Sequence, residues 1–294
     1  MQKILVTGAK GQVGSELQYL ASSFPEFLFF FTDYEELDIT HAEAVLSFFE
    51  THQFNYCINC AAYTAVDKAE SDADRAFAIN VTGIKHLAAA CQSVNGRLIH
   101  LSTDYVYHTL QNIPFKEDDS TEPQSVYAIT KLEGEQIAQA LNPNTMIIRT
   151  SWVYSSFGHN FVKTMLRLGK EREQLRIVFD QIGTPTYARA LAEAMLTIIQ
   201  KIESRAVEPA AFTGIYHYSN EGVTSWYDFA RAILQWADMH IPIFPIETKE
   251  YPTPAQRPPF SVLNKSKIKT TFGLTIPHWQ DSLTECLDAI YADL

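Results

Sequence analysis

The sequence lacks several features that would point to whole classes of protein. It has no uninterrupted apolar run of the ~18 residues that a transmembrane helix needs, and the phenylalanine-rich run at 27–31 is far too short. It opens into an apolar segment without the regions of a signal peptide, so we expect a cytoplasmic protein. Acidic residues outnumber basic ones, giving a formal net charge of −11 at pH 7. We therefore expect no nucleic-acid partner and no membrane partner.

Cysteine is also scarce, with four in 294 residues, which is typical of a reducing compartment. Cys57 and Cys60 form a C-x-x-C motif, but residues 55–61 read as a strand, which points successive side chains to opposite faces. No second cysteine pair and no histidine cluster completes a metal site. We interpret both cysteines as buried strand residues and predict no metal.

The pattern of apolar residues alternates between strand-like and helix-like segments. Strands are expected at 3–7, 27–33, 55–60, 97–102 and 145–149, the second of them buried, with long helices at 73–94 and 127–141. This alternation predicts an α/β fold of the Rossmann type, a doubly wound parallel sheet with helices on both faces. After residue 151 proline and aromatic residues become more frequent, and helices are expected at 160–170, 185–202 and 225–237.

A glycine-rich loop lies between the first strand and the first helix. Gly8, Gly11 and Gly14 permit a tight turn and a close approach of backbone to a pyrophosphate, which a helix N-terminus can bind. The position predicts dinucleotide binding. Asp33, at the end of the second strand, can accept hydrogen bonds from ribose hydroxyls and favours NADH, whereas Lys10 could contact a 2′-phosphate. The choice between NADH and NADPH stays open.

Tyr127 and Lys131 have the spacing that places two side chains on one face of a helix. Such a pair also arises by chance, but here it accompanies a nucleotide-binding loop. An ammonium close to a phenol lowers the pKa of the phenol, so we expect Tyr127 to exchange a proton during carbonyl reduction. Trp152 follows a strand end, which indicates a role in the site. Arg257 lies in the proline-rich segment 251–259, where a rigid loop and a surface linker both remain possible.

Together with segments 59–64 and 102–107, these motifs resemble the extended short-chain dehydrogenase/reductase family. Segments 65–70, 149–154 and 251–258 resemble its dTDP-4-dehydrorhamnose reductase branch. The resemblance implies NAD(P)H-dependent reduction of the C4 ketone of dTDP-4-dehydro-L-rhamnose to dTDP-L-rhamnose, a precursor of cell-surface polysaccharide. It also implies two interleaved domains. The dinucleotide-binding domain would comprise 1–150 and about 175–203, and a smaller α/β substrate-binding domain 151–174 and about 204–294.

The resemblance assigns roles to individual residues. The cofactor would be bound by the three glycines together with Gln12, Val13, Asp33, Asp38, Ile39, Ala62, Tyr63, Thr64, Tyr127 and Lys131. Catalysis would fall to Tyr127, Lys131 and Thr103, the last of which would hydrogen-bond the sugar ketone or Tyr127. The dTDP-sugar would be bound by Thr103, Asp104, Trp152 and Arg257.

Two departures from the family pattern stand out. Ala128 replaces the glycine that commonly follows the catalytic tyrosine. Some relatives dimerise through Mg²⁺ bound by glutamates, one of which would be Glu16, but Arg189 occupies the place of the second acid. A cation there disfavours Mg²⁺, so Mg²⁺ is doubtful and we expect a monomer, with a dimer as the alternative.

Three other functions remain compatible with the sequence. One is a reductase or epimerase of another nucleotide-linked 4-keto sugar, which would use the same Thr103, Tyr127 and Lys131. The second is a non-catalytic NAD(P)-binding regulatory subunit, and the intact Thr103, Tyr127 and Lys131 favour an enzyme over it. The third is an NAD-sensing regulator that binds the cofactor without turnover.

Overall fold

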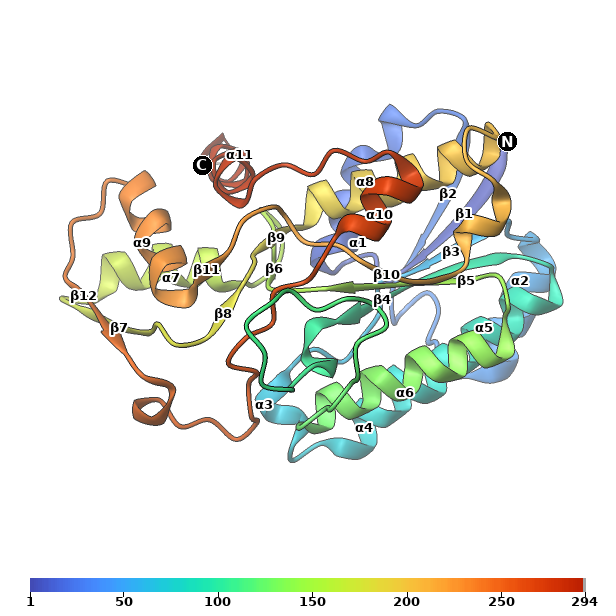
Figure 1. Ribbon diagram of the computed structural model, residues 1–294. Helices are drawn as coiled ribbons and strands as arrows, with labels where there is room; N and C mark the ends of the chain where they lie inside the picture. The colour runs from blue at the N-terminus through green and yellow to red at the C-terminus, as the bar shows by residue number, and fades with distance from the viewer. Residues whose placement is uncertain (293–294) are drawn as a thin grey trace.

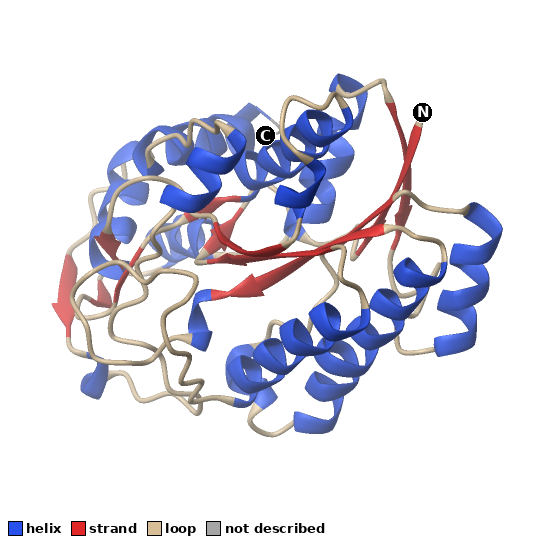
Figure 2. Cartoon of the chain, turned by 45° about the vertical axis from the view of Figure 1, so that its right-hand side comes forward, coloured by secondary structure: helices blue, strands red, loops and turns tan. Residues whose placement is uncertain are grey.

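The computed structural model describes residues 1–292, and its centre is a six-stranded sheet in the order β10-β5-β4-β3-β1-β2. Figure 2 shows the central strands between two groups of helices. All neighbouring strands in this sheet pair in parallel. The strands are β1 (Gln2–Thr7), β2 (Phe27–Thr32), β3 (Tyr56–Asn59), β4 (Arg97–Thr103), β5 (Thr145–Thr150) and β10 (Gly214–His217). The predicted α/β doubly wound fold is confirmed.

Helices cover both faces of the sheet because alternate strand residues enter two different cores. Ile4 and Val6 of β1 pack with one core, and Leu5 packs with the other. Figure 1 shows the helices of the first core on one side of the sheet and those of the second core on the other side. The first set is α1 (Gln12–Leu20), α8 (Ala188–Glu203) and α10 (Ser266–Phe272); the second is α2 (Ala42–His52), α5 (Ile84–Ser93) and α6 (Val126–Leu141).

A second region lies beyond the end of the main sheet (Figure 1). Its core is formed by α7 (Phe161–Glu171), α9 (Trp226–Trp236) and α11 (Trp279–Ala292). Short two-stranded sheets border it, built from β6 (Val153–Tyr154), β7 (Leu175–Val178), β8 (Ile182–Gly183), β9 (Thr186–Tyr187), β11 (Thr224–Ser225) and β12 (Ile243–Ile246). The domain division stays a prediction, and within the segment 204–294 both β10 and α10 pack with the main sheet.

Strand β2 differs from the buried strand that its phenylalanines predicted. It lies at the edge of the sheet, where Phe27 is buried but Leu28 is 42% exposed and Phe29 to Phe31 are half-buried. An edge strand has a neighbour on one side only, so hydrophobic composition does not ensure complete burial.

The helix expected over 73–94 contains a π-helical stretch. Helix α4 (Ala73–Phe77) continues into π-helix Ala78–Gly83 before α5 begins. The side chain of Asn80 accepts a hydrogen bond from the Tyr63 backbone N–H at 2.8 Å and donates to the Thr130 hydroxyl at 3.1 Å. A Cβ at Gly134 would lie 2.3 Å from the Asn80 carbonyl oxygen, so α6 crosses this stretch in close contact. π-bulges often occur at functional sites.

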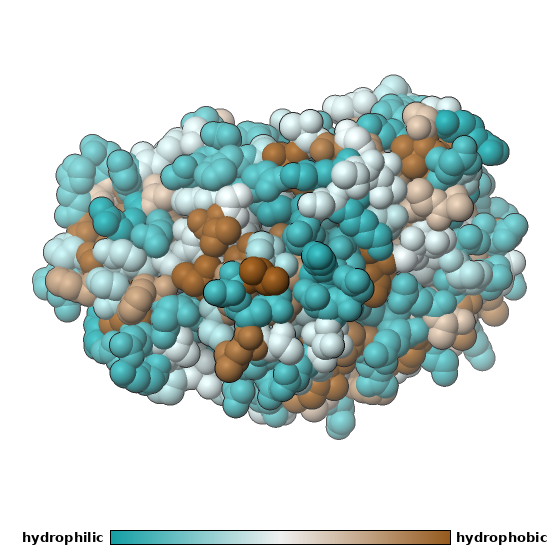
Figure 3. Space-filling model, in the orientation of Figure 1, coloured by the Kyte–Doolittle hydropathy of each residue, from teal (hydrophilic) through white to brown (hydrophobic). Residues whose placement is uncertain are grey.

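One face of the molecule carries apolar side chains in small groups. On the face shown in Figure 3, hydrophobic residues form separate patches within a largely hydrophilic surface. Small scattered groups of this kind are normal for a folded protein. Among residues 1–292, no helix has both the length and the apolar composition needed to cross a bilayer.

Candidate active site

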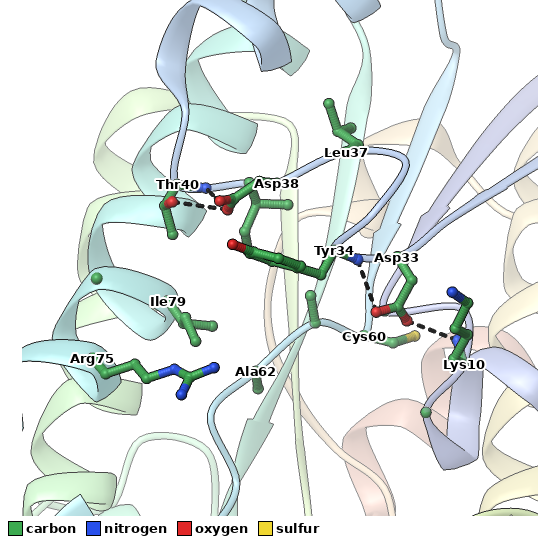
Figure 4. A pocket seen from close by; sticks show the side chains of 15 residues that line it. Lys10, Asp33, Tyr34, Leu37, Asp38, Thr40, Cys60, Ala62, Arg75 and Ile79 are labelled. Carbon is green, nitrogen blue, oxygen red and sulfur yellow. Dashed lines mark hydrogen bonds between the residues drawn. The ribbon is translucent and has the colours of Figure 1, made fainter. Parts of the chain in front are cut away.

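A cavity of about 650 Å³ lies at the carboxyl ends of β1, β2 and β3 (Figure 4). Its volume is in the range of small-molecule sites. It is lined by Gly8, Lys10, Gly11, Asp33, Tyr34, Leu37, Asp38, Ile39, Thr40, Cys60, Ala61, Ala62, Arg75, Ala78 and Ile79. Of the residues predicted to bind a cofactor, this set includes Gly8, Gly11, Asp33, Asp38, Ile39 and Ala62.

The glycine loop is tightly packed at the two positions where no side chain fits. Gly8 has φ +67°, and a Cβ there would lie 2.6 Å from the Ala61 backbone nitrogen. A Cβ at Gly14 would lie 2.3 Å from the Gly8 carbonyl oxygen. Helix α1 begins at Gln12 with Gly11 as its N-cap and without a side-chain hydrogen bond to the cap. Its first backbone N–H groups can therefore bind an anion.

Other predicted cofactor residues have their side chains directed elsewhere. Gln12 accepts a hydrogen bond from Asn160 at 3.0 Å, and Val13 packs in the core. Tyr63 packs with Ala69 and donates from its hydroxyl to Asp72 at 3.0 Å. Thr64 is exposed. Residue type alone does not reveal that the side chains of Gln12, Val13 and Tyr63 have partners within the chain.

The end of the cavity near Asp33 is strongly acidic. Asp33 accepts hydrogen bonds from the backbone N–H groups of Lys10 and Tyr34, each at 2.8 Å (Figure 4). The amine of Lys10 pairs with Glu35 at 2.6 Å and lies 3.8 Å from Glu36. The one cation of the glycine loop is thus already paired with acids. This pairing reduces its attraction for a 2′-phosphate.

Tyr127, Thr103 and Asp104 form a continuous hydrogen-bonded group where β4 meets α6. Helix α6 is fixed at its start by Ser125, whose hydroxyl accepts from the Ala128 N–H at 3.2 Å. Tyr127 is half-buried, and its hydroxyl is hydrogen-bonded to Thr103. Thr103 donates to Asp104 Oδ1 at 3.1 Å. The structure therefore brings together the residues predicted to contact the reacting ketone.

Lys131 lies one turn further along α6 and is buried. Its amine donates to the Leu101 carbonyl at 2.7 Å and lies 3.3 Å from His100 Nε2. Burial lowers the pKa of Lys131 to about 8 and raises the pKa of Tyr127 to about 12. The expected lowering of the Tyr127 pKa by Lys131 is therefore wrong in this arrangement, because desolvation of the phenol outweighs its hydrogen bond with Thr103 and the lysine amine is bound to β4.

Asp104 is the one buried carboxyl group in this hydrogen-bonded group. Burial raises its pKa to about 7, although hydrogen bonds from Ser261 and Thr103 act in the opposite direction. Its Oδ2 has no hydrogen-bond partner within residues 1–292. Ser261 reaches the site from the C-terminal part of the chain, and no local sequence pattern marked it.

Trp152 is stacked on a second tryptophan. The ring centroids of Trp152 and Trp226 are 3.7 Å apart with an interplanar angle of 12°. Trp152 has φ +47°, and a Cβ at Gly183 would lie 2.7 Å from its six-membered ring. Trp226 is the first residue of α9. The sequence analysis predicted a helix there but no role for Trp226 in the site.

Arg257 connects the proline-rich loop to the first half of the chain. Its guanidinium donates to both carboxylate oxygens of Asp67, at 3.1 and 2.7 Å, and to Thr253 at 2.5 Å. Asp67 also accepts from the Ala255 N–H at 3.2 Å. The sequence analysis assigned no role to Asp67, although Asp67 lies in segment 65–70, one of those that resemble the family.

Glu16 is buried and pairs within the chain. Arg189 Nε donates to Glu16 Oε2 at 2.8 Å, and the Ser155 hydroxyl donates to Oε1 at 2.6 Å. Each carboxylate oxygen of Glu16 thus has a partner. Across residues 1–292, no group of three or more histidine, cysteine, aspartate and glutamate side chains could hold a metal ion.

The doubly wound sheet, the glycine loop and the tyrosine beside a strand-end hydroxyl are those of an extended short-chain dehydrogenase/reductase. The family model described as the RmlD substrate binding domain matches residues 1–292. A dTDP-4-dehydrorhamnose reductase of Aggregatibacter actinomycetemcomitans is 41% identical over 289 residues, 96% of this chain and 97% of that protein. The chain belongs to the dTDP-4-dehydrorhamnose reductase family.

Two solved structures of this family are also similar to the chain. The dTDP-4-dehydrorhamnose reductase from Clostridium acetobutylicum has a TM-score of 0.93 and 42% identity, covering 99% of this chain and 100% of that one. The enzyme of the same name from Bacillus anthracis, in complex with NADP, has a TM-score of 0.91 and 36% identity, covering 98% and 100%. The similarity therefore extends over both regions of the fold.

Proposed function

We propose that this protein reduces the C4 ketone of dTDP-4-dehydro-L-rhamnose to dTDP-L-rhamnose with NADPH or NADH. The family relationship supports this substrate, and the NADP complex of the Bacillus anthracis relative supports the cofactor. The observation that carries the proposal is the hydrogen-bonded group of Tyr127, Thr103 and Asp104. It lies at the carboxyl end of β4, at the same edge of the sheet as the dinucleotide cavity.

The residues of the cavity fit a dinucleotide. Gly8 and Gly14 leave no room for side chains beside the loop, and the uncapped start of α1 can bind the pyrophosphate. Asp33 is placed to accept hydrogen bonds from the adenosine ribose. A reduced nicotinamide bound here would supply the hydride.

Tyr127 is the proposed proton donor. Because its pKa is about 12, Tyr127 holds its proton at neutral pH and can give it to an oxygen that gains negative charge. The Thr103 hydroxyl lies beside the tyrosine hydroxyl and, by turning away from Asp104, can donate a second hydrogen bond to the same oxygen. Lys131 in its charged form would stabilise the tyrosinate that remains.

Substrate selection is assigned to residues around this group. Asp104 and Thr103 would bind the sugar hydroxyls, since Asp104 Oδ2 has a free acceptor position among the described residues. Trp152 would pack on the sugar or the nucleotide with a part of its ring that Trp226 does not cover. Arg257 would donate to the diphosphate from the proline-rich loop, with its charge partly balanced by the ion pair to Asp67.

We infer a monomer without a bridging metal, because Arg189 and Ser155 already satisfy Glu16. Light scattering with and without EDTA tests this, and a dimer that EDTA dissociates would contradict it. A reaction that uses reduced nicotinamide and a nucleotide sugar agrees with the cytoplasmic location that the sequence predicts.

The direct test is oxidation of NADPH and NADH in the presence of dTDP-4-dehydro-L-rhamnose, with the product identified by NMR. Other dTDP- and GDP-linked 4-keto sugars serve as controls for substrate choice. We expect dTDP-L-rhamnose to form in proportion to the reduced cofactor consumed. Binding of the dinucleotide without oxidation by any keto sugar would instead indicate a regulatory subunit.

A further inference from the structure

A buried row of hydrogen bonds connects Lys131 to the strand that precedes the glycine loop. The amine of Lys131 lies 3.3 Å from His100 Nε2, and His100 Nδ1 lies 2.9 Å from Asn59 Nδ2. The hydroxyl of Thr7 donates to Asn59 Oδ1 at 2.6 Å. All four side chains are buried, and they come from α6, β4, β3 and β1. None of the roles proposed above uses His100.

The hydrogen-bond donors in this row determine the state of the His100 ring. The backbone N–H of Ala61 donates to Asn59 Oδ1 at 3.2 Å, so the amide oxygen of Asn59 faces Ala61 and Thr7. The amide NH₂ of Asn59 therefore faces His100, and His100 Nδ1 must be the acceptor. Burial is the main cause that holds the pKa of His100 well below its ordinary value, and it acts whether or not Lys131 is charged, so the ring is neutral. A neutral ring with an acceptor at Nδ1 carries its hydrogen on Nε2.

The hydrogen on Nε2 points at the amine of Lys131. A lysine ammonium can only donate hydrogen bonds, whereas an uncharged amine can also accept one. The amine donates to the Leu101 carbonyl at 2.7 Å, which leaves its lone pair for His100. Every hydrogen bond in the row is satisfied when Lys131 is uncharged, and a charged Lys131 would place two donors against each other.

From these contacts, and resting on the function proposed above, we propose that His100 is a positioning residue that holds the amine of Lys131 and favours its uncharged form. The other ionisable groups facing this amine are Glu135, on the next turn of α6, and Cys60, at the end of β3, and both favour the charged form. Burial acts in the same direction as His100 and lowers the pKa of Lys131 to about 8. Lys131 would then gain or lose its proton within the pH range in which the enzyme works.

The substitution His100→Gln separates this role from simple packing. A glutamine whose carbonyl faces Lys131 offers an acceptor where His100 presents a donor, at the cost of the bond from the Asn59 amide. A hydrogen bond to a charged group is strong enough to raise the pKa of Lys131 by about one unit or more. His217→Gln is the matched control, because His217 is also buried but bonds Tyr107 instead of Lys131.

The experiment is an NMR titration of the full chain labelled with ¹³C at the lysine side chains, with Lys131→Met used to assign the resonance. We expect a midpoint near 8 in the parent protein and in His217→Gln, and a midpoint about one pH unit higher or more in His100→Gln. The alkaline limb of the pH–rate profile should move with it. An unchanged midpoint in His100→Gln would overturn the proposal.

A second measurement needs no substitution and guards against a variant that does not fold. The ¹⁵N shifts of the His100 ring in the parent protein report which nitrogen carries the hydrogen. We expect Nε2–H with an unprotonated Nδ1 at neutral pH, and either the opposite tautomer or a doubly protonated ring would overturn the proposal. The lysine titration and the ¹⁵N measurement both work without turnover. Their outcome is therefore distinguishable from a failure of the proposed reaction.

Discussion

Asp67 and Arg257, 190 residues apart in the sequence, form a two-point ion pair that ties the proline-rich loop to the first half of the chain. The shorter contact is 2.7 Å between Nη2 and Oδ2. Arg257 holds the pKa of Asp67 below its ordinary value. The pair therefore restricts the loop that carries Arg257 and partly balances the charge of its guanidinium.

This relationship predicts the effect of Arg257→Lys. Lysine keeps the charge but cannot make the two-point contact, so the loop is less well ordered and the substrate binds more weakly. We expect KM for the sugar nucleotide to rise about tenfold with little change in kcat, since one hydrogen bond to a charged group is worth ~1.5–3 kcal/mol. Asp67→Asn should have a similar effect. Steady-state kinetics in which KM is unaltered in both variants would contradict the role of the pair.

The buried ion pair of Arg149 and Glu135 predicts a large loss of stability when one partner is removed. Arg149 Nη2 lies 2.7 Å from Glu135 Oε2, and the two side chains are only 3% and 2% exposed. Arg149→Met would leave Glu135 buried without its partner, at a cost of about 3–5 kcal/mol in the free energy of unfolding. The double variant with Glu135→Leu should recover much of this loss. Urea denaturation provides the measurement, and a single variant as stable as the parent would count against the prediction.

The raised pKa of the buried Asp104 carboxyl group leads to an unusual dependence of stability on pH. Its pKa in the folded state is raised to about 7 from an unfolded value of ~3.9, so the folded protein binds the extra proton between these values. Stability therefore falls as the pH rises from about 4 to 7, by up to ~1.4 kcal/mol per pH unit from this group. Asp104→Asn should gain stability relative to the parent over this range. Unfolding curves of the parent protein and of Asp104→Asn at pH 5 and pH 7.5 test this. An equal difference in the free energy of unfolding between the two proteins at both pH values would contradict it.

The ion pair between Lys10 and Glu35 indicates how the cofactor preference can be changed. Its amine is paired with Glu35 at 2.6 Å, at the end of the cavity where a 2′-phosphate would lie. Glu35→Gln removes one negative charge and releases the lysine, so NADPH should bind about two- to fivefold more tightly while NADH changes less. Fluorescence titration of both cofactors measures this at low salt, with Glu50→Gln on α2 as control. Tighter binding of NADH alone would contradict the interpretation.

Much of the fold could be predicted because its signals are local. The first five strands of the main sheet coincide closely with runs of apolar and β-branched residues, and each ends in a polar residue at the same edge. The glycine loop and the spacing of Tyr127 and Lys131 are equally local. By contrast, β10 is only four residues long and lies in an irregular stretch, so no periodic pattern marked it.

The contacts that complete the site could not be predicted because they join distant segments. Trp226 stacks on Trp152, and Ser261 bonds Asp104, across separations that no spacing rule describes. The position of the Lys131 amine depends on His100 and the Leu101 carbonyl on a neighbouring strand. For the same reason the sequence gives the wrong direction for the pKa of Tyr127, since burial is a property of the assembled fold.

The central claim is that Tyr127 protonates the ketone oxygen, and single-turnover kinetics of Tyr127→Phe test it most directly. Dinucleotide and dTDP-4-dehydro-L-rhamnose are premixed with excess enzyme, and the decay of reduced nicotinamide is followed. We expect the rate of reduction to fall about 10²- to 10⁴-fold while the dissociation constant of the dinucleotide stays within about twofold. A rate close to that of the parent protein would show that the proton comes from another group and would contradict the account.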